Sequence, residues 1–501
     1  MRLGERFLTT TPSLGFAADR SQSEFGNGLL SLHRARTHVQ PEPPPDVSLE
    51  QAPISPVDPG EPVASALRAT SYRVPRLAPG NHASGNRARG NRVLTEDVGR
   101  LVLRLGLPVT IGFIFATLLN AVDRFFVSLL PEPSVALAAV GCAFALDLIV
   151  IALGSGLSQG AASAVARRIG AGRADAAGVA GAQVVSVALV LTAVLALASS
   201  AADPLMHLIA ATPDVHHEAT QYAQVVLWGA CGWLGISALG GILRGEGDTK
   251  TPMKANLLAI GLNLLLDPLF IFDWGLGLGV AGAAWATVLA RTVGAVYLLL
   301  MLSRSTRFVV GMRAFRLRLD RPAMRDVLGI SIPSSGVTML SALSIFVVLR
   351  LLGDIAGETG QAAFLLGYLF DQLAFLPVIG LAVGLTTVVG QNHGAGLGHR
   401  EREAIRWCLL YSLLLTGSFC LLYWAAAPWL VGLFAGGNAE LRDVAATFLR
   451  IDAFSLPFIA VLVTVSASFS GRGRGWPGLA LHSVRLLVLG IPLFLLLQPY
   501  G

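Results

Sequence analysis

The sequence predicts an all-α, polytopic membrane protein built from two homologous halves. Three observations support this prediction: low charge, long apolar stretches and an internal repeat. Of the 501 residues, 53% are hydrophobic and only 14% are charged, whereas soluble domains carry about 25% charged residues. The apolar stretches are about 20 residues or longer, which is enough to cross a hydrocarbon core of roughly 30 Å.

The apolar stretches predict eleven membrane-spanning helices, all of which follow residue 100. They are expected at 101–130, 135–166, 176–210, 218–244, 252–273, 278–303, 326–352, 361–391, 403–434, 441–470 and 477–498. The segment before them is rich in Pro, Gly, Ser and Arg and has no apolar period, so we expect a disordered extension. The expected segments are the extension 1–98, a first lobe 99–310, a basic cytoplasmic linker 311–325 and a second lobe 326–501.

The basic residues predict the orientation of the chain in the membrane. Loops after even-numbered stretches contain the basic clusters, such as Arg167-Arg168 and the seven arginines between 304 and 325. Loops after odd-numbered stretches contain one arginine, Arg442. An excess of Lys and Arg marks the cytoplasmic side, so we expect the N-terminus there and the protein in the cell (inner) membrane. This topology explains the net charge of +6 without a nucleic-acid partner.

An internal repeat relates the two halves of the chain. The segment 160–172 aligns with 384–396, and both segments end in Gly-Ala-Gly. Leu107-Pro108 aligns with Ile332-Pro333 at nearly the same offset, 225 against 224 residues. An offset that spans six helices gives both halves the same orientation, which is a parallel repeat. The counterpart of 278–303 would lie beyond Gly501, so we expect the twelfth helix to be missing.

The segment 277–282 spells GxGxxG, which is the fingerprint of a dinucleotide-binding loop. That loop needs a preceding strand and an acidic residue about 20 positions later. Here an apolar helix is expected before it, and 283–303 contains no Asp or Glu. We therefore interpret the motif as a tight turn into a helix whose small residues allow close packing.

Asp267 lies within an apolar stretch, next to Pro268. A charged side chain in mid-membrane costs roughly 2.5–3.5 kcal/mol. Pro268 also frees the carbonyl near Leu264, one turn earlier, and Asn263 lies one turn before Asp267 on the same helix face. The three features suit a site for a proton or Na⁺. A structural hydrogen bond to a neighbouring helix is the alternative.

Other polar residues within the apolar stretches extend this candidate site. Asp123 follows Asn120 in the first span, where an ion pair with Arg124 is the alternative to a cation site. Thr287 could add a hydroxyl, unless it bonds to its own backbone. Asp371 is the candidate for a site in the second lobe. The remaining polar residues of this kind are Asp147, Arg291, Arg350, Arg450, Asp452, His482 and Arg485.

Several segments together resemble the multidrug and toxic compound extrusion (MATE) family, particularly its DinF-like branch. The resemblance runs from about Leu101 onward and rests on 107–127, 156–172, 243–253, 262–290 and 384–396. It implies twelve helices in two lobes, and export of amphipathic, often cationic organic molecules against H⁺ or Na⁺. No other cofactor is implied.

The resemblance also implies a cation site in the first lobe. In the DinF-like branch, this site uses an aspartate on the first helix, an Asn-x-x-x-Asp pair on the fifth and a threonine on the sixth. Asp123, Asn263, Asp267 and Thr287 match these positions. The branch can also have a tyrosine one turn before the first aspartate, where this chain has Leu119.

The expected function is thus antiport of small organic compounds by a protein that we expect to be a monomer in membrane lipid. One alternative is a lipid-linked saccharide flippase of a related fold, which would need Arg291, Arg350 and Arg485 to line a cavity for a pyrophosphate. Another is an inactive remnant that lacks its twelfth helix. An enzyme is not expected, because no nucleophile–base pair, metal cluster or phosphate loop is found in the sequence, and the four cysteines lack a CxxC spacing.

Overall fold

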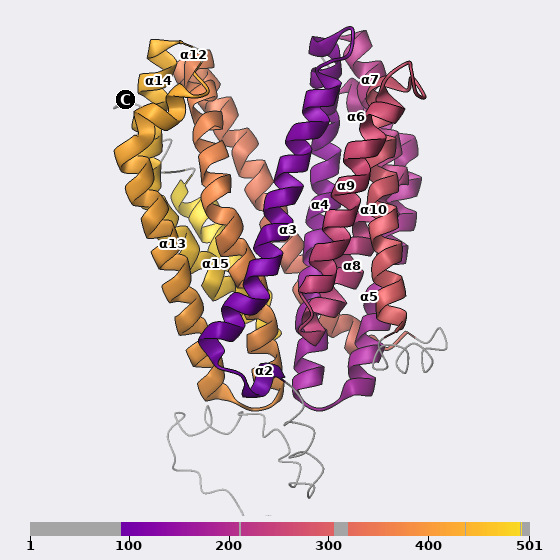
Figure 1. The fold of residues 1–501 in the computed structure, drawn as a ribbon, viewed down its shortest axis with the longest axis vertical. Helices are drawn as coiled ribbons and strands as arrows, with labels where there is room; N and C mark the ends of the chain where they lie inside the picture. Colours follow the sequence, from indigo (N-terminus) through magenta and orange to yellow (C-terminus); the bar gives the residue numbers. More distant parts are fainter. Residues whose placement is uncertain (1–91, 210–211, 305–318, 436, 491, 493–501) are drawn as a thin grey trace, which may run out of the picture. The chain divides into compact units, whose positions relative to one another are not determined.

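The structure, a computed structural model, describes residues 92–209, 212–304, 319–435, 437–490 and 492. These residues form helices joined by short turns, with no strand among them (Figure 1). Eight of the described helices are long and apolar enough to cross a membrane, or nine if one bent pair is a single span. The all-helical membrane fold is thus confirmed, and the count of eleven spans stays a prediction.

Most of the predicted extension, most of the predicted linker and the end of the last predicted span lie outside the described residues. The described end of the extension, residues 92–98, includes a short helix. The first half begins with a short helix, α2 (Arg92–Thr95). It continues with α3 (Val98–Val127), α4 (Pro133–Gly170), α5 (Ala174–Ala198), η2 (Ser199–Ala201), α6 (Ala202–His207), α7 (Pro213–Trp228), α8 (Ala230–Glu246), α9 (Lys250–Ile271) and α10 (Gly279–Ser303).

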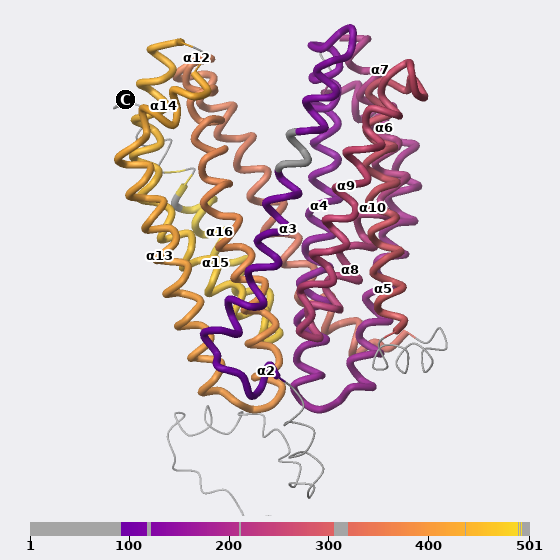
Figure 2. Tube along the Cα trace, viewed as in Figure 1, coloured from indigo at the N-terminus to yellow at the C-terminus, as the bar shows by residue number. Residues whose placement is uncertain are grey.

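The second half contains a long bent helix, several shorter helices and a π-helical turn. These elements are α12 (Arg321–Gly394), α13 (Gly398–Gly432), α14 (Ala439–Asp452), η3 (Ala453–Ser455), α15 (Leu456–Gly471), α16 (Trp476–Ser483) and η4 (Val484–Gly490). Helices α13, α15 and α16 lie together in the view of Figure 2, and α15 and α16 are in contact.

Helix α12 contains two predicted spans, 326–352 and 361–391. Its backbone is helical except at Gly357, where φ is 58° and ψ is −152°. The positive φ favours glycine, because a Cβ atom would clash there. Gln361 Nε2 donates to the Leu349 carbonyl at 2.9 Å, so the two arms approach each other on either side of Gly357. The loop expected at 353–360 is therefore a sharp break within a nearly continuous helix.

Two other predicted spans are interrupted where the backbone has a local reason to break. The span predicted at 218–244 is bent by 40° between α7 and α8. At the bend, a Cβ on Gly229 would lie 2.3 Å from Val288 Cγ1, so glycine permits the close approach of α10. The span predicted at 441–470 is interrupted by η3, just before Pro457, which cannot donate a helical backbone hydrogen bond.

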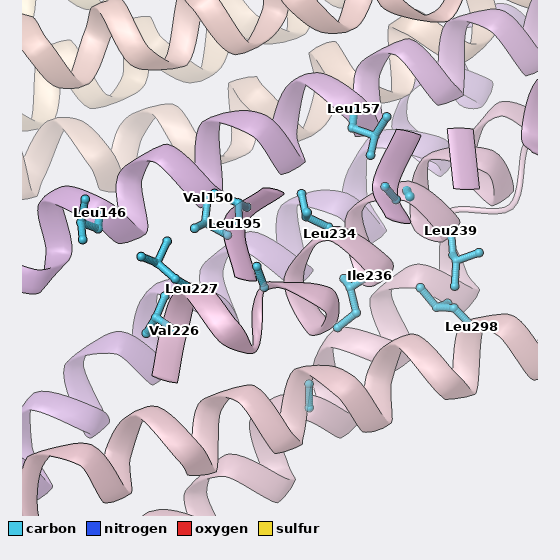
Figure 3. Close-up of a cluster of buried hydrophobic side chains, with 14 of the residues drawn as sticks. Leu146, Val150, Leu157, Leu195, Val226, Leu227, Leu234, Ile236, Leu239 and Leu298 are labelled. Carbon is cyan, nitrogen blue, oxygen red and sulfur yellow. The ribbon is translucent and has the colours of Figure 1, made fainter. Parts of the chain in front are cut away.

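Small side chains dominate the buried core of the first half. This core includes Leu146, Val150, Leu157, Leu234 and many alanines, and Figure 3 shows part of it. Between helices in lipid, close van der Waals packing replaces the hydrophobic driving force that acts in water, and small residues favour that packing. The first half is thus a tightly packed support for the polar side chains within it.

Helix α3 packs against helices of both halves (Figure 1). Near its N-terminus, Leu101 and Leu105 share a buried cluster with Leu385 of α12 and Cys408 of α13. Farther along, α3 packs against α9 of the first half. Its second part therefore brings Asp123 toward the polar face of α9.

The two halves also meet at the ends of several helices through polar contacts. Asp326 accepts hydrogen bonds from Arg167 Nη2 at 2.5 Å and Arg168 Nη1 at 2.6 Å. Thr387 Oγ1 donates to the Arg244 carbonyl at 2.9 Å. The neighbouring loops carry the basic clusters, so this junction lies on the predicted cytoplasmic side. We call these contacts the cytoplasmic junction.

Candidate functional site

Four polar side chains from three helices of the first half meet at one place. Asn263 Nδ2 donates to Asp267 Oδ1 at 2.6 Å and to Asp123 Oδ1 at 3.3 Å. Thr287 Oγ1 donates to Asn263 Oδ1 at 3.2 Å. The amide of Asn263 thus connects α9 with α3 on its donor side and with α10 on its acceptor side. The structure brings together four of the five residues predicted for this site.

The fifth residue, Asn120, lies on α3, but its side chain is outside the described residues, as is that of Leu119. Helix α9 supplies two of the four assembled groups because Asn263 and Asp267 are one turn apart. Pro268 follows Asp267 within the helix and cannot donate to the carbonyl one turn earlier. The local sequence of α9 therefore presents an amide, a carboxyl group and a free carbonyl within one turn.

The site is deeply buried and rich in oxygen atoms. Asp267 is 0% exposed and Asn263 is 1% exposed. Asp267 Oδ2 is buried and receives no hydrogen bond from the described residues. The carboxyl groups of Asp123 and Asp267 also lie within hydrogen-bonding reach of each other. Two adjacent carboxylates repel unless a cation lies between them, so this set of groups is suited to a proton or Na⁺.

The contacts of Asp123 and Thr287 bear on their local alternatives. Arg124 lies 6.0 Å from the centre of the Phe144 ring and interacts electrostatically with Asp123, but no ion pair between the two is found among the described contacts. Thr287 donates to Asn263 of another helix. Sequence reasoning left Asp147 and Arg291 unpaired, whereas the structure places them in electrostatic contact. That contact joins α4 to α10, so no local spacing indicates it.

Asp371 has a partner that the sequence could not indicate. In the second half, the side chains of Asp371 on α12 and Asp452 on α14 are in hydrogen-bonding reach, and Arg485 interacts with both charges. Ser455 Oγ donates to Asp452 Oδ1 at 3.3 Å. Buried oxygens of both aspartates, Asp371 Oδ1 and Asp452 Oδ2, lack a hydrogen-bond donor among the described residues. The second half thus has a carboxyl pair of its own, with an arginine beside it.

The GxGxxG segment is a tight turn, as predicted. Gly277 and Gly279 have φ values of 62° and 56°. A Cβ on Gly282 would lie 2.4 Å from the Phe270 carbonyl oxygen, so the start of α10 packs directly on the end of α9. In the described chain the preceding element is α9, not a strand. These glycines allow the turn that returns α10 toward Asn263.

A helical membrane domain with buried carboxyl groups shared between its helices has the architecture of a membrane transporter. Comparison with known families identifies which kind. The MatE family profile matches residues 108–269 and 333–496, and the two matches begin at the positions that the internal repeat pairs. The chain belongs to the MatE family. It is a multi-pass membrane transporter of this efflux family and not an enzyme.

Curated relatives and solved structures extend over most of the chain. A protein of Thermotoga maritima described as "Probable multidrug resistance protein NorM" is 26% identical over 349 residues, which is 68% of this chain and 74% of the relative. A protein of Shewanella oneidensis described as an "FAD transporter" is 28% identical over 420 residues, 80% of this chain and 88% of the relative. A crystal structure of "MATE in complex with MaL6" matches with a TM-score of 0.75 at 31% identity, and covers 82% of this chain and 92% of that one.

Proposed function

We propose that this chain exports amphipathic, cationic organic compounds in exchange for H⁺ or Na⁺ across the cell (inner) membrane. We assign it to the DinF-like branch of its family and expect a monomer with a cytoplasmic N-terminus. The observation that supports this proposal is the link that Asn263 makes between Asp123 and Asp267, at 3.3 and 2.6 Å. A buried carboxyl pair held by one amide is a site for a cation.

Coupling would follow from the dependence of this site on helix position. Asp123 lies on α3, which packs with both halves, whereas Asn263 and Asp267 lie on α9. A movement of α3 relative to α9 would change the separation of the two carboxyl groups. A ligand shifts a conformational equilibrium only by its different affinities for the two states. The coupling ion and a cationic substrate would then favour different arrangements of α3.

The pair formed by Asp371 and Asp452 is a second candidate for the cation, in the second lobe. Arg485 interacts with both carboxyl groups, so a positive charge already faces this pair. Arg291 and Arg124 also interact electrostatically with Asp123, but the amide of Asn263 links the carboxyl groups of Asp123 and Asp267 directly. We therefore assign the coupling ion to the first lobe.

The flippase alternative needs arginines that face one cavity. Arg291 lies 4.7 Å from the centre of the Trp233 ring. Arg350 pairs with Asp354 at 2.5 Å on the exposed surface of its helix. Arg485 faces the carboxyl pair of the second half. Each arginine thus has a different local partner, and no observation favours a shared pyrophosphate site.

Transport by purified protein in vesicles tests the proposal. A fluorescent organic cation is loaded on the predicted cytoplasmic side, and pH and Na⁺ gradients are imposed separately. We expect one gradient to drive export, and Asp267→Asn to abolish the driven component while leaving insertion intact. The matched control is Asp273→Asn, which changes an exposed aspartate in the α9–α10 turn and should export like the unchanged chain.

The same vesicles test the class of substrate. One relative is described as an FAD transporter, so FAD is offered as a second cargo. Export of the organic cation but not of FAD would support the proposal. Export of FAD alone would contradict the cationic substrate class, and driven export that survives in Asp267→Asn would contradict the site.

A further inference from the structure

A basic cavity lies at the cytoplasmic junction, at the start of α12. Its volume is about 580 Å³, and it is lined by Arg321, Pro322, Arg325, Asp326, Gly329 and Gly473. Arg321 and Arg325 are one turn apart on α12, and both are exposed. Neither has an ion-pair or hydrogen-bond partner among the described contacts. Two guanidinium groups therefore face the same cavity with their charges uncompensated.

The acidic groups near the cavity are already engaged. Asp326 accepts from Arg167 Nη2 at 2.5 Å and from Arg168 Nη1 at 2.6 Å. Asp320, which caps the N-terminus of α12, accepts from the Ala323 backbone N–H at 2.7 Å. Four arginines are thus gathered around two carboxylates. The region has an excess of positive charge that an anion would neutralise.

Two glycines line the cavity beside these arginines, and one of them leaves space for an anion. A Cβ at Gly329 would meet no heavy atom within 4 Å, so the wall of the cavity is open at this position. Gly473 has a φ of 85°, and a Cβ there would lie 2.7 Å from Arg167 Cζ. The cavity lining at Gly473 is thus in direct contact with Arg167, the arginine of the first half that pairs with Asp326.

We propose that this cavity binds a phosphate-bearing anion, and that its position at the membrane surface favours the headgroup of an anionic phospholipid. The planar guanidinium fork matches phosphate oxygens in a bidentate geometry. Basic pockets on the cytoplasmic side of membrane helices hold such headgroups. Trp476, which follows the turn of Gly473, and Leu319, which precedes α12, are 61% and 67% exposed. These apolar side chains provide surfaces for acyl chains beside the charged cavity.

A bound phosphate at this place would stabilise the junction between the two halves. It would reduce the repulsion among Arg321, Arg325 and the two arginines that hold Asp326. Both halves contribute charge to this region, so occupancy of the cavity would favour the arrangement in which they are in contact. The cavity is a different site from the carboxyl groups of the first lobe, and this inference does not depend on the identity of the exported compound.

Native mass spectrometry of the purified full-length chain tests the proposal. The protein is titrated with phosphatidylglycerol and, separately, with phosphatidylcholine. Arg321→Gln/Arg325→Gln should weaken phosphatidylglycerol binding roughly 25-fold, since each guanidinium near a lipid surface contributes a factor of about five. The matched control is Arg402→Gln/Arg406→Gln, which removes two exposed arginines one turn apart on α13 and should change binding by less than about twofold. Phosphatidylcholine should bind all variants equally, which also reports intact folding.

A second variant separates the cavity from general surface charge. Gly329→Leu keeps every arginine but fills the space beside them, and it should also lose phosphatidylglycerol binding. Equal losses in the two double-arginine variants, or full binding by Arg321→Gln/Arg325→Gln, would overturn the proposal. Competition by sn-glycerol 1-phosphate would identify the phosphate group itself as the bound element. Its failure to compete, with the arginine dependence intact, would identify the lipid headgroup with its chains.

Discussion

At the scale of single residues, one amide determines the geometry of the candidate site. Asn263 uses its N–H groups for two carboxyl groups and its oxygen for the hydroxyl of Thr287. A protonated or cation-bound carboxyl pair would keep all of these partners. In the proposed cation site, removal of the cation would leave two adjacent charges that the amide donors must stabilise, so the position of Asn263 would control how strongly the pair holds a cation.

Thr287→Val tests the contribution of the hydroxyl to this arrangement. Valine keeps the shape of threonine but cannot donate to Asn263, so the amide loses one of the contacts that orient it. A hydrogen bond contributes about 0.5–1.5 kcal/mol, so the concentration of the driving ion for half-maximal export should rise about 2- to 10-fold. The control is Thr292→Val on the same helix. The Thr292 hydroxyl donates to the carbonyl of Val288, one turn earlier in α10, at 2.7 Å. Equal effects in both variants would mean that Thr287 has no special role.

The sequence could predict only part of this neighbourhood. Asn263 and Asp267 share a helix face, so their spacing alone places them together. The contacts of Asp371 with Asp452 and Arg485 join helices that are distant in the chain. No local pattern encodes such contacts, because they depend on how whole helices pack. For the same reason, the sequence left open whether Asp123 pairs with Arg124 or with a cation site.

At the scale of helices, the internal repeat is visible as a reciprocal contact. Gly170 and Gly394 occupy equivalent positions in the two repeated segments and end α4 and α12. A Cβ on Gly170 would lie 1.9 Å from the Gln391 carbonyl oxygen, and a Cβ on Gly394 would lie 2.0 Å from the Arg167 carbonyl oxygen. Each glycine thus packs against the backbone of the other segment. The repeat predicted two similar halves, but only the structure shows that the repeated turns touch each other.

Gly394→Ala tests this contact. The added methyl group meets backbone atoms that cannot rotate away, so α4 and α12 must separate. Such overpacking costs about 1–3 kcal/mol, and the free energy of unfolding in detergent should fall by this amount. Gly417→Ala on α13 is the control, since a Cβ there meets nothing within 4 Å and alanine favours a helix by about 1 kcal/mol. A stability of Gly394→Ala that matches the control would contradict the close contact.

Hydropathy predicted where apolar helices lie, but not where they break. Gly229 interrupts a predicted span without changing the apolar character of the surrounding sequence, whereas Gly357 lies within the loop predicted at 353–360. A hydropathy average over about 20 residues is insensitive to a bend at one small residue. The boundaries of single helices therefore followed from the sequence better than the bends within them.

At the scale of the whole transporter domain, the described contacts between the halves are concentrated at the cytoplasmic junction. Thr387 is 0% exposed and donates to the Arg244 carbonyl, and Gln391 Nε2 donates to the Gly245 carbonyl at 2.9 Å. Asp326 adds ion pairs to Arg167 and Arg168. These contacts close the domain on its predicted cytoplasmic side. A transporter that collects its substrate from the cytoplasm must open this junction during each cycle.

A cysteine at Thr387 measures that opening. In a chain whose four native cysteines are replaced by alanine, Thr387→Cys should react slowly with a membrane-impermeant maleimide applied to the cytoplasmic side. If the open state has a population of 0.1–10%, labelling should be about 10- to 1,000-fold slower than at Arg402→Cys, an exposed position on α13. Addition of substrate together with the driving gradient should accelerate labelling at 387 and leave it unchanged at 402, because only the junction is alternately covered and uncovered. Fast labelling at 387 without substrate would show that the junction is open at rest. Slow labelling at 387 during active export would show that the halves separate elsewhere.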